Sequence, residues 1–353
     1  MSFTVNSRTF AAAAALAFAL TSYSTSADAQ TKTIRASIQA PAASHLSKGF
    51  DHLLGEIEKV TEGRVKFERY YSGSLAKPNE QLRATSTGLA GLALAVPTYV
   101  PGQLPLANVG GNPALWVDSW VGSKAYQALY DQVPAMHAEL DKQGVKLISA
   151  FVTPTYYPMA RNIELNNLNQ FKGMRVMTSG QIAVLLQSLG AQIVNIATPE
   201  GYEALQRGTV DGAVYGVTSA ATYNVETVVK SLWRVPLGGL PMLVIMNKKV
   251  WESLSPEDQK AILKVAEGQA DSFHRIYQIG GDDESLKKFV NAGVKVIDAD
   301  PASVAGLQKA AEKIWNDWAA EQDKAGLPGK QTMDLFVKLN AEYTKKNPYL
   351  ATK

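Results

Sequence analysis

The stretch LNQFKGMRVMTSGQIAVLLQSLGAQIVNIATPEGYEALQRGTVDGAVYG, residues 168–216, decides the fold. Its apolar runs predict strands at 174–177, at 192–196 and from Val210, with two helices between them, the second opened by Pro199. Crossover helices between short apolar runs are typical of a parallel βαβαβ unit. Because such a unit gathers its loops where the strands end, small ligands bind at the carboxyl ends of the strands. We therefore look for function there.

Residues 1–29 have the pattern of a secretory signal peptide. Arg8 precedes an apolar run at 11–20, and a small-residue triplet at 27–29 follows a polar segment, which predicts cleavage before Gln30. The apolar run is about ten residues long, whereas a spanning helix requires about 20, so a retained membrane anchor is the weaker interpretation. We expect the mature chain to be soluble and periplasmic.

The composition narrows the classes of function. The chain has 353 residues, no cysteine and a net charge of +3. The lack of cysteine excludes disulfides, thiol catalysis, zinc–thiolate sites and a lipoprotein anchor. No block of Lys and Arg with interleaved aromatic residues is present, so we expect no nucleic-acid partner.

The rest of the chain predicts two α/β lobes that exchange segments. A strand at 33–40, an amphipathic helix and a strand at 64–70 form a first βαβ unit. Pro154 and Pro158 mark the first crossing between lobes, and a strand at 242–246 returns the chain. The predicted boundaries are 30–154 plus about 242–282 for lobe I, and 155–241 plus about 283–353 for lobe II.

A long helix is expected to join the two lobes. Ser255 and Pro256 are a strong helix start, and the helical pattern continues to about residue 290. Such a helix would be about 50 Å long at 1.5 Å per residue, which exceeds one lobe. Gly280 and Gly281 are the expected kink. The predicted fold class is therefore α/β, a two-lobed hinged clamp with a long helix bridging both lobes.

Several residues at strand ends are candidate ligand contacts. His45 follows the first strand, and Tyr99 follows the buried run at 89–96. Tyr157 lies in the first crossing, and Tyr215 ends the opening stretch. We expect these side chains to face the cleft between the lobes.

No catalytic constellation is recognisable in the sequence. The four histidines form no metal-ligand pair spaced i,i+4, and no Walker, G-x-S-x-G or G-x-G-x-x-G motif occurs in a suitable context. Ser74 and Lys77 match S-x-x-K without its partner motifs, and the acids at 282–284 are adjacent residues that point apart on a helix. We expect no enzyme activity, no metal site and no cofactor, and a secreted α/β enzyme is the least favoured alternative.

Arginine is the residue that a small anion in a closed cleft would need, because a guanidinium offers two parallel donors to a carboxylate. Arg161, Arg175 and Arg207 are the candidates in lobe II. Arg207 lies in the last turn of a helix, where a cation favours the helix dipole, so we expect it to be structural. Arg161 follows the crossing and Arg175 lies in a strand, so each could face the cleft.

Four segments in order carry a resemblance to a known family. They are TEGRVKFERYYSGSLA (61–76), FKGMRVM (171–177) with SLGAQIVNI after it, YEALQRGTVDG (202–212) and WESLSPEDQKAI (251–262). Over essentially its whole mature length the chain resembles the DctP-type substrate-binding proteins of tripartite ATP-independent periplasmic (TRAP) transporters. The resemblance implies two lobes joined by a hinge and a bridging helix, a ligand closed between them, and delivery to small and large membrane subunits.

The chain departs from the family pattern where the ligand is bound. In most members the strand after "K-G" carries an arginine that forms a salt bridge with a substrate carboxylate, and here Met177 takes that place. The family's "D-G-x-E" loses its acid, with Tyr215 next. A second family arginine corresponds best to Arg161, and Arg175 could reach the vacated space because residues two apart on a strand share a face. Met177 would then line the site as an apolar contact.

These observations favour a periplasmic TRAP-type binding protein for a small organic acid, a monocarboxylate with an apolar or aromatic body. The expected ligand contacts are Arg161, Arg175, Met177, Tyr215, Tyr99, His45 and Tyr157, with Arg161 as the main partner of the carboxylate. Two alternatives stay open, namely a binding protein of an ABC-type importer and a TRAP binding protein whose ligand lacks a carboxylate.

Overall fold

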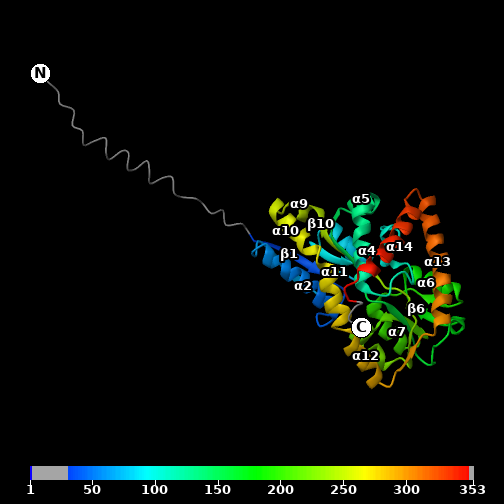
Figure 1. Ribbon diagram of the computed structural model, residues 1–353. Helices are drawn as coiled ribbons and strands as arrows, with labels where there is room; N and C mark the ends of the chain where they lie inside the picture. Colours follow the sequence, from blue (N-terminus) through cyan, green and yellow to red (C-terminus); the bar gives the residue numbers. More distant parts are fainter. Residues whose placement is uncertain (2–30, 350–353) are drawn as a thin grey trace.

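The computed structural model describes residues 31–349 together with Met1, so the predicted signal peptide lies outside the described residues. The fold has two β-sheets, each covered by helices, and it confirms the predicted α/β architecture (Figure 1). Within the described residues, no helix is both long enough and apolar enough to cross a membrane.

Lobe I is built on a five-stranded sheet with the order β2-β1-β3-β10-β4. Its strands are β1 (Lys32–Ser37), β2 (Val65–Tyr70), β3 (Leu92–Ala95), β4 (Val145–Val152) and β10 (Pro241–Asn247). β10 runs antiparallel between β3 and β4, while β1 is parallel to β2 and to β3. Thus β1, β3 and β4 all end on the same side of this sheet.

Lobe II is built on a six-stranded sheet with the order β11-β9-β5-β8-β6-β7. Its strands are β5 (Tyr156–Ala160), β6 (Arg175–Met177), β7 (Gln192–Val194), β8 (Gly212–Gly216), β9 (Ser231–Arg234) and β11 (Lys295–Asp298). β6 is parallel to both β7 and β8, with α6 (Gly180–Ser188) and α7 (Gly201–Gln206) in the crossovers. The predicted βαβαβ unit at 168–216 is therefore confirmed.

The direct step from β4 to β5 fixes which end of the lobe II sheet meets lobe I. β5 runs antiparallel to β8, and its first residue, Tyr156, pairs with the last residue of β8, Gly216. The start of β5 therefore lies beside the carboxyl ends of β6 and β8, and we call this the near end of the sheet. At the far end, Ala160 pairs with Gly212, beside the start of β6.

The long helix that was predicted to join the lobes, with a kink at Gly280 and Gly281, is divided into more pieces than expected. It consists of α10 (Pro256–Ala266), α11 (Gln269–Phe273), a π-helical segment (His274–Ile279) and α12 (Asp282–Asn291). Ser255 caps its start by accepting a hydrogen bond from the backbone N–H of Asp258. The prediction missed the break at Gly268, whereas the expected break at Gly280 and Gly281 is present. A Cβ at Gly281 would meet the carbonyl oxygen of Tyr277 at 2.6 Å, so this crossing point requires glycine.

The last helices differ from the predicted boundary of lobe II. α13 (Pro301–Lys324) packs beside α6, and α14 (Gly329–Lys346) then returns to α4 (Ser119–Gln132) in lobe I (Figure 1). Phe336 of α14 lies 6.1 Å from the rings of both Trp116 and Tyr126, measured between ring centroids. Trp116 and Tyr126 of lobe I thus bury the C-terminal helix, which no local pattern in that helix indicates.

The remaining helices pack around the two sheets and the helix that joins the lobes. They are α2 (His45–Val60), α3 (Gln81–Ser86), α5 (Pro134–Lys142), α8 (Val217–Thr222) and α9 (Lys248–Glu252), with short 3-10 turns that include Pro97–Tyr99 and Thr198–Glu200. α2 buries Phe50, Leu53 and Ile57 against lobe I, as its spacing predicted.

Candidate functional site

A chain of contacts crosses between the lobes at the near end of the lobe II sheet. The hydroxyl of Tyr99, in lobe I, lies 3.0 Å from the hydroxyl of Thr198 in lobe II and accepts a hydrogen bond from the Thr198 backbone N–H at 3.3 Å. Tyr215 donates to the backbone carbonyl of Thr198 at 2.6 Å, and its hydroxyl lies 3.8 Å from the sulfur of Met177. The structure therefore brings together three of the predicted site residues and adds Thr198.

Local sequence explains how these side chains reach one another. Pro97 opens the short turn that carries Tyr99 beyond β3, and Pro199 opens the turn that presents Thr198 beyond β7. Gly201 begins α7, and a Cβ there would overlap both the Tyr215 hydroxyl and the Met177 sulfur. A glycine at this position is thus a condition for the contact between α7 and the ends of β6 and β8.

Three more tyrosines lie around this chain of contacts. Tyr156 begins β5, Tyr223 follows α8, and Tyr277 belongs to the π-helical segment. Together with Tyr99 and Tyr215 they form what we call the tyrosine cluster. Burial raises the pKa of all five phenols, and several of them raise one another's pKa further. At neutral pH the cluster therefore offers uncharged hydroxyl groups that can both donate and accept hydrogen bonds.

The charged groups nearest to the tyrosine cluster are acids. Beyond burial and neighbouring groups, Glu200 raises the pKa of Tyr99 and Asp282 raises that of Tyr277. Asp282 accepts a hydrogen bond from Thr218 at 2.8 Å. Among residues 31–349, no arginine or lysine is buried. Arg234 ends β9 beside Tyr157, hydrogen-bonds to its side chain and is paired with Asp298 at 2.9 Å, so this arginine lies toward the near end of the sheet.

The two predicted arginines lie at the far end of the sheet. Arg175 begins β6, and its guanidinium donates to both carboxylate oxygens of Asp211, at 3.0 and 2.6 Å. Arg161 follows the last residue of β5, and its guanidinium lies against Gly208. The strands separate both from the near end by about 13 Å, taking 3.3 Å per residue over β8. The expectation that Arg161 or Arg175 faces the cleft is not supported by this arrangement.

Tyr157 and His45 lie neither in the chain of contacts between the lobes nor at the far end of the sheet. Tyr157 pairs directly with Tyr215 across β5 and β8, and the charged groups around it are Asp282, Arg234 and Asp298. His45 begins α2 in lobe I, where burial and then Lys48 lower its pKa. Glu284 and Lys288 of α12 and the backbone of Gly280 also act on His45, so it lies beside the helix that joins the lobes.

Sequence reasoning missed four residues of the site, namely Thr198, Tyr156, Tyr223 and Tyr277. One signal was available for Tyr156, because it begins the same strand as the predicted residue Tyr157, at the end of the sheet that meets lobe I. No local pattern marks Tyr223 or Tyr277, which reach the cluster only through the packing of α8 and the π-helical segment.

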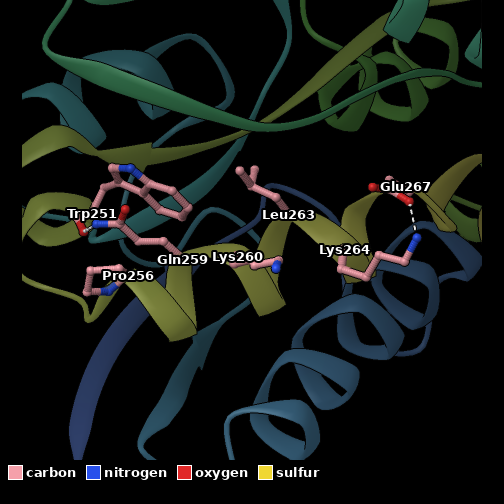
Figure 2. Close-up of a pocket in the computed structure, with 7 residues that line it drawn as sticks. All are labelled: Trp251, Pro256, Gln259, Lys260, Leu263, Lys264 and Glu267. Atoms are coloured by element: carbon pink, nitrogen blue, oxygen red, sulfur yellow. Dashed lines mark hydrogen bonds and ion pairs between the residues drawn. The ribbon is translucent and has the colours of Figure 1, made fainter.

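The surface hollows of lobe I lie away from this site. One hollow of about 410 Å³ runs along α9 and α10, between Trp251, Gln259 and Leu263 (Figure 2). A second, of about 750 Å³, lies between Lys32, Arg64 and Ser255. Neither includes a residue of the tyrosine cluster. Within the described part of the chain, no group of three or more His, Asp or Glu side chains could hold a metal ion.

The profile of one protein family matches most of the chain. The family is described as "Bacterial extracellular solute-binding protein, family 7", or DctP, and it matches residues 36–322. The chain belongs to this family. It is therefore a DctP-type protein of the TRAP transporter class, whose members bind substrates for transport and are not enzymes.

Individual relatives agree with this assignment. A solute-binding protein of Albidiferax ferrireducens is 28% identical over 306 residues, which cover 84% of this chain and 89% of the relative. A TRAP solute-binding protein of Rhodoferax ferrireducens with copurified benzoate has a TM-score of 0.83 at 18% identity, covering 89% of this chain and 99% of that one. One from Bordetella bronchiseptica with bound mandelate has a TM-score of 0.80 at 19% identity, covering 88% and 99%. These two structures establish the two-lobed fold.

Proposed function

We propose that this DctP-type protein captures a small organic acid with an aromatic or apolar body, closes it between the lobes at the tyrosine cluster, and delivers it to the small and large subunits of a TRAP permease. The observation that carries the proposal is the chain of contacts from Tyr99 through Thr198 to Tyr215 and Met177. It joins one lobe to the other at the ends of β3, β6 and β8, where ligands of α/β proteins bind.

The shape and chemistry of the cluster favour a flat, largely apolar solute. Tyrosine rings offer apolar faces together with hydroxyl groups at their rims, and Met177 adds a flexible apolar contact. The proteins from Rhodoferax ferrireducens and Bordetella bronchiseptica, which share the fold, hold benzoate and mandelate. Both are acids with one aromatic ring, and this supports the same class of solute here.

The family assignment also bears on the cellular location of the protein. Members are extracytoplasmic binding proteins, and we propose that the chain is exported and acts in a periplasm. Of the two alternatives to a TRAP-bound acid, the family profile disfavours an ABC-type importer. The benzoate and mandelate held by two proteins of the same fold support a ligand with a carboxylate over one without.

Thermal denaturation against a panel of solutes tests the proposal. A solute that binds only the folded protein raises its stability in proportion to RT ln(1 + [L]/Kd). We expect benzoate, mandelate and 3-hydroxybenzoate to raise the Tm, and succinate and glucuronate to leave it unchanged. If succinate or glucuronate raises the Tm and none of the three aromatic acids does, the proposed solute class is wrong.

A further inference from the structure

Arg234 ends β9 at the near end of the lobe II sheet. We infer that Arg234 binds the carboxylate of the solute, with its guanidinium on the two carboxylate oxygens and the hydroxyl of Tyr157 beside it. This inference rests on the proposed function and names the residue that recognises the head group of the acid. A solute with a single carboxylate is the class that this arrangement fits.

Strand direction separates Arg234 from the other basic residues of this part of lobe II. Residues 155–241, all of which the structure describes, contain four arginines and two lysines. The five other than Arg234 lie toward the far end of the sheet, and they are Arg161, Lys172, Arg175, Arg207 and Lys230. β9 runs antiparallel to β5, with Ser231 opposite Ala160, so the last residue of β9 reaches the near end. Arg234 is thus the basic residue of this segment that lies where the lobes meet.

The register of the strands places Arg234 in a row with two tyrosines. Tyr157 is opposite Tyr215 across β5 and β8, and Asp298 is beside Arg234 across β11 and β9. The register of β5 and β9 brings Arg234 opposite Tyr157. Residues opposite one another in a sheet point to the same face, so these four side chains lie on one face at the near end. Two strand spacings of about 4.8 Å separate the backbones of Arg234 and Tyr215.

Side-chain contacts link this row to the tyrosine cluster. The guanidinium of Arg234 hydrogen-bonds to the Tyr157 hydroxyl, and Asp282 acts on the same hydroxyl by its charge. Asp282 also acts on Tyr277 of the cluster and accepts a hydrogen bond from Thr218 of α8. A head group held by Arg234 and Tyr157 therefore leaves the aromatic body of the solute beside the rings of the cluster.

The guanidinium of Arg234 has more donors than Asp298 and Tyr157 require. The side chain is 45% exposed, and its ion pair joins Nη1 to one oxygen of Asp298 at 2.9 Å. Asp298 is 81% exposed, so water screens this pair. Arg175, in contrast, donates to both oxygens of Asp211. With five N–H donors, Arg234 can keep both of its partners and still present two parallel donors to a carboxylate.

The charges beside the row limit the number of carboxylates that the solute can carry. Asp298 approaches from β11, and Asp282 approaches from the start of α12. One solute carboxylate shares the guanidinium of Arg234, and this ion pair strengthens when closure of the lobes removes water from it. A second carboxylate near the row would meet the two acids without a cation of its own, which is strongly unfavourable.

Paired calorimetric titrations with benzoate and benzamide test this inference, because the two probes have nearly the same shape and differ in charge. Wild type should bind benzoate at least about 10²-fold more tightly than benzamide, the order of effect of removing one partner of a buried ion pair. Arg234→Met keeps an unbranched side chain and removes the charge. It should lower the affinity for benzoate by a similar factor and leave that for benzamide within about twofold of wild type. Arg234→Lys should recover part of the benzoate affinity, because it restores the charge without the paired donors.

Arg207→Met is the matched control, because Arg207 pairs with Glu203 on an exposed face of lobe II, and it should change neither affinity. Asp298→Asn removes the present partner of Arg234 and should leave the benzoate affinity equal to or above that of wild type. Unchanged benzoate binding in Arg234→Met, or an equal loss for both probes, would overturn the inference and leave the proposed function standing. A loss in Asp298→Asn as large as that in Arg234→Met would overturn it too, since the ion pair within the protein would then be the determinant. Failure of every aromatic acid to bind wild type would overturn both proposals.

Discussion

The two ends of the lobe II sheet differ in how their polar groups are paired. At the far end, Arg175 and Asp211 form a two-point ion pair that leaves 43% and 39% of their side chains exposed. At the near end, Tyr215 is fully buried and its hydroxyl is paired with a backbone carbonyl of Thr198. Strands β5, β6 and β8 thus have charged side chains at the end that faces away from lobe I and neutral hydroxyl groups at the end that faces lobe I. From this difference we propose that Arg175 stabilises lobe II through Asp211 and that the tyrosines of the near end bind the solute.

The largest expected effect follows from adding a methyl group at Gly201, a position where the near end requires glycine. Gly201→Ala would place a methyl group on both the Tyr215 hydroxyl and the Met177 sulfur. We expect the affinity for the best solute of the aromatic panel to fall by about 10²-fold or more, since small displacements at a closed site have large effects. Calorimetric titration measures this loss.

Gly55→Ala in α2 is the control for that substitution, because a Cβ at Gly55 meets nothing within 4 Å. This change should leave the affinity unaltered and slightly raise the stability, as Ala does in a helix. An unchanged affinity in Gly201→Ala would show that the near end does not shape the site.

A smaller effect is expected from the hydrogen bonds between the lobes. Tyr99→Phe keeps the ring and removes the hydroxyl that contacts the Thr198 side chain and backbone. Because a neutral hydrogen bond contributes about 0.5–1.5 kcal/mol, the solute affinity should fall roughly threefold to tenfold. The measurement is again calorimetric. Tyr130→Phe is the control, because Tyr130 is a buried tyrosine of α4 outside the cluster. An equal loss of affinity in both variants would show that Tyr99 has no special role.

A substitution at the far end should change the stability of the protein and not its affinity for the solute. The hydrogen bond from Arg175, followed by the backbone N–H, lowers the pKa of Asp211. A carboxylate with a lowered folded-state pKa stabilises the protein above its unfolded-state pKa near 3.9, and this contribution is lost as the pH falls through the folded-state value. Arg175→Ala should therefore lower the free energy of unfolding by about 0.5–1 kcal/mol at pH 7, the usual range for an exposed pair.

The difference between wild type and Arg175→Ala should shrink below about pH 4, as Asp211 becomes protonated in both. Urea denaturation at several pH values measures it. Arg207→Ala is a suitable comparison, because its pair with Glu203 is far more exposed, at 74% and 68%. A loss of solute affinity in Arg175→Ala that exceeds its loss of stability would contradict the assignment of the far end.

The smallest expected effect is that of Arg161→Ala. The family resemblance makes this residue the natural partner of a carboxylate, yet it follows the far end of β5 and packs against Gly208. We expect the affinity for every solute of the panel to stay within about twofold of wild type, a difference too small to reflect a lost buried contact. A hundredfold loss would place the head group at the far end.

The sequence alone predicted the parts of the fold that depend on local patterns. The alternation of strands and helices at 168–216 follows from its apolar periodicity, and the start of α10 follows from Ser255 and Pro256. The return of α14 to lobe I was not predictable, because its apolar stripe is compatible with either lobe. Only the contact of Phe336 with Trp116 and Tyr126, far apart in the sequence, decides the choice.

The residues of the candidate site were likewise only partly predictable from the sequence. Tyr99, Met177 and Tyr215 were predictable because each lies at or just beyond the carboxyl end of a strand, and the parallel arrangement brings such ends together. Arg161 illustrates the limit of reasoning from residue type. Its guanidinium suits a carboxylate, but the antiparallel direction of β5 carries it to the opposite end of the sheet, and strand direction within a sheet is not written in any local pattern.

The position of the bound solute decides whether the near end of the lobe II sheet is the binding site. A crystal structure of the protein with the aromatic solute that raises its Tm most would show the ring and head group in electron density. We predict density among Tyr99, Tyr215 and Tyr277, with the head group within hydrogen-bonding distance, about 3 Å, of a tyrosine hydroxyl. Density that places the head group against the guanidinium of Arg161 or Arg175 would show that the far end binds the solute instead.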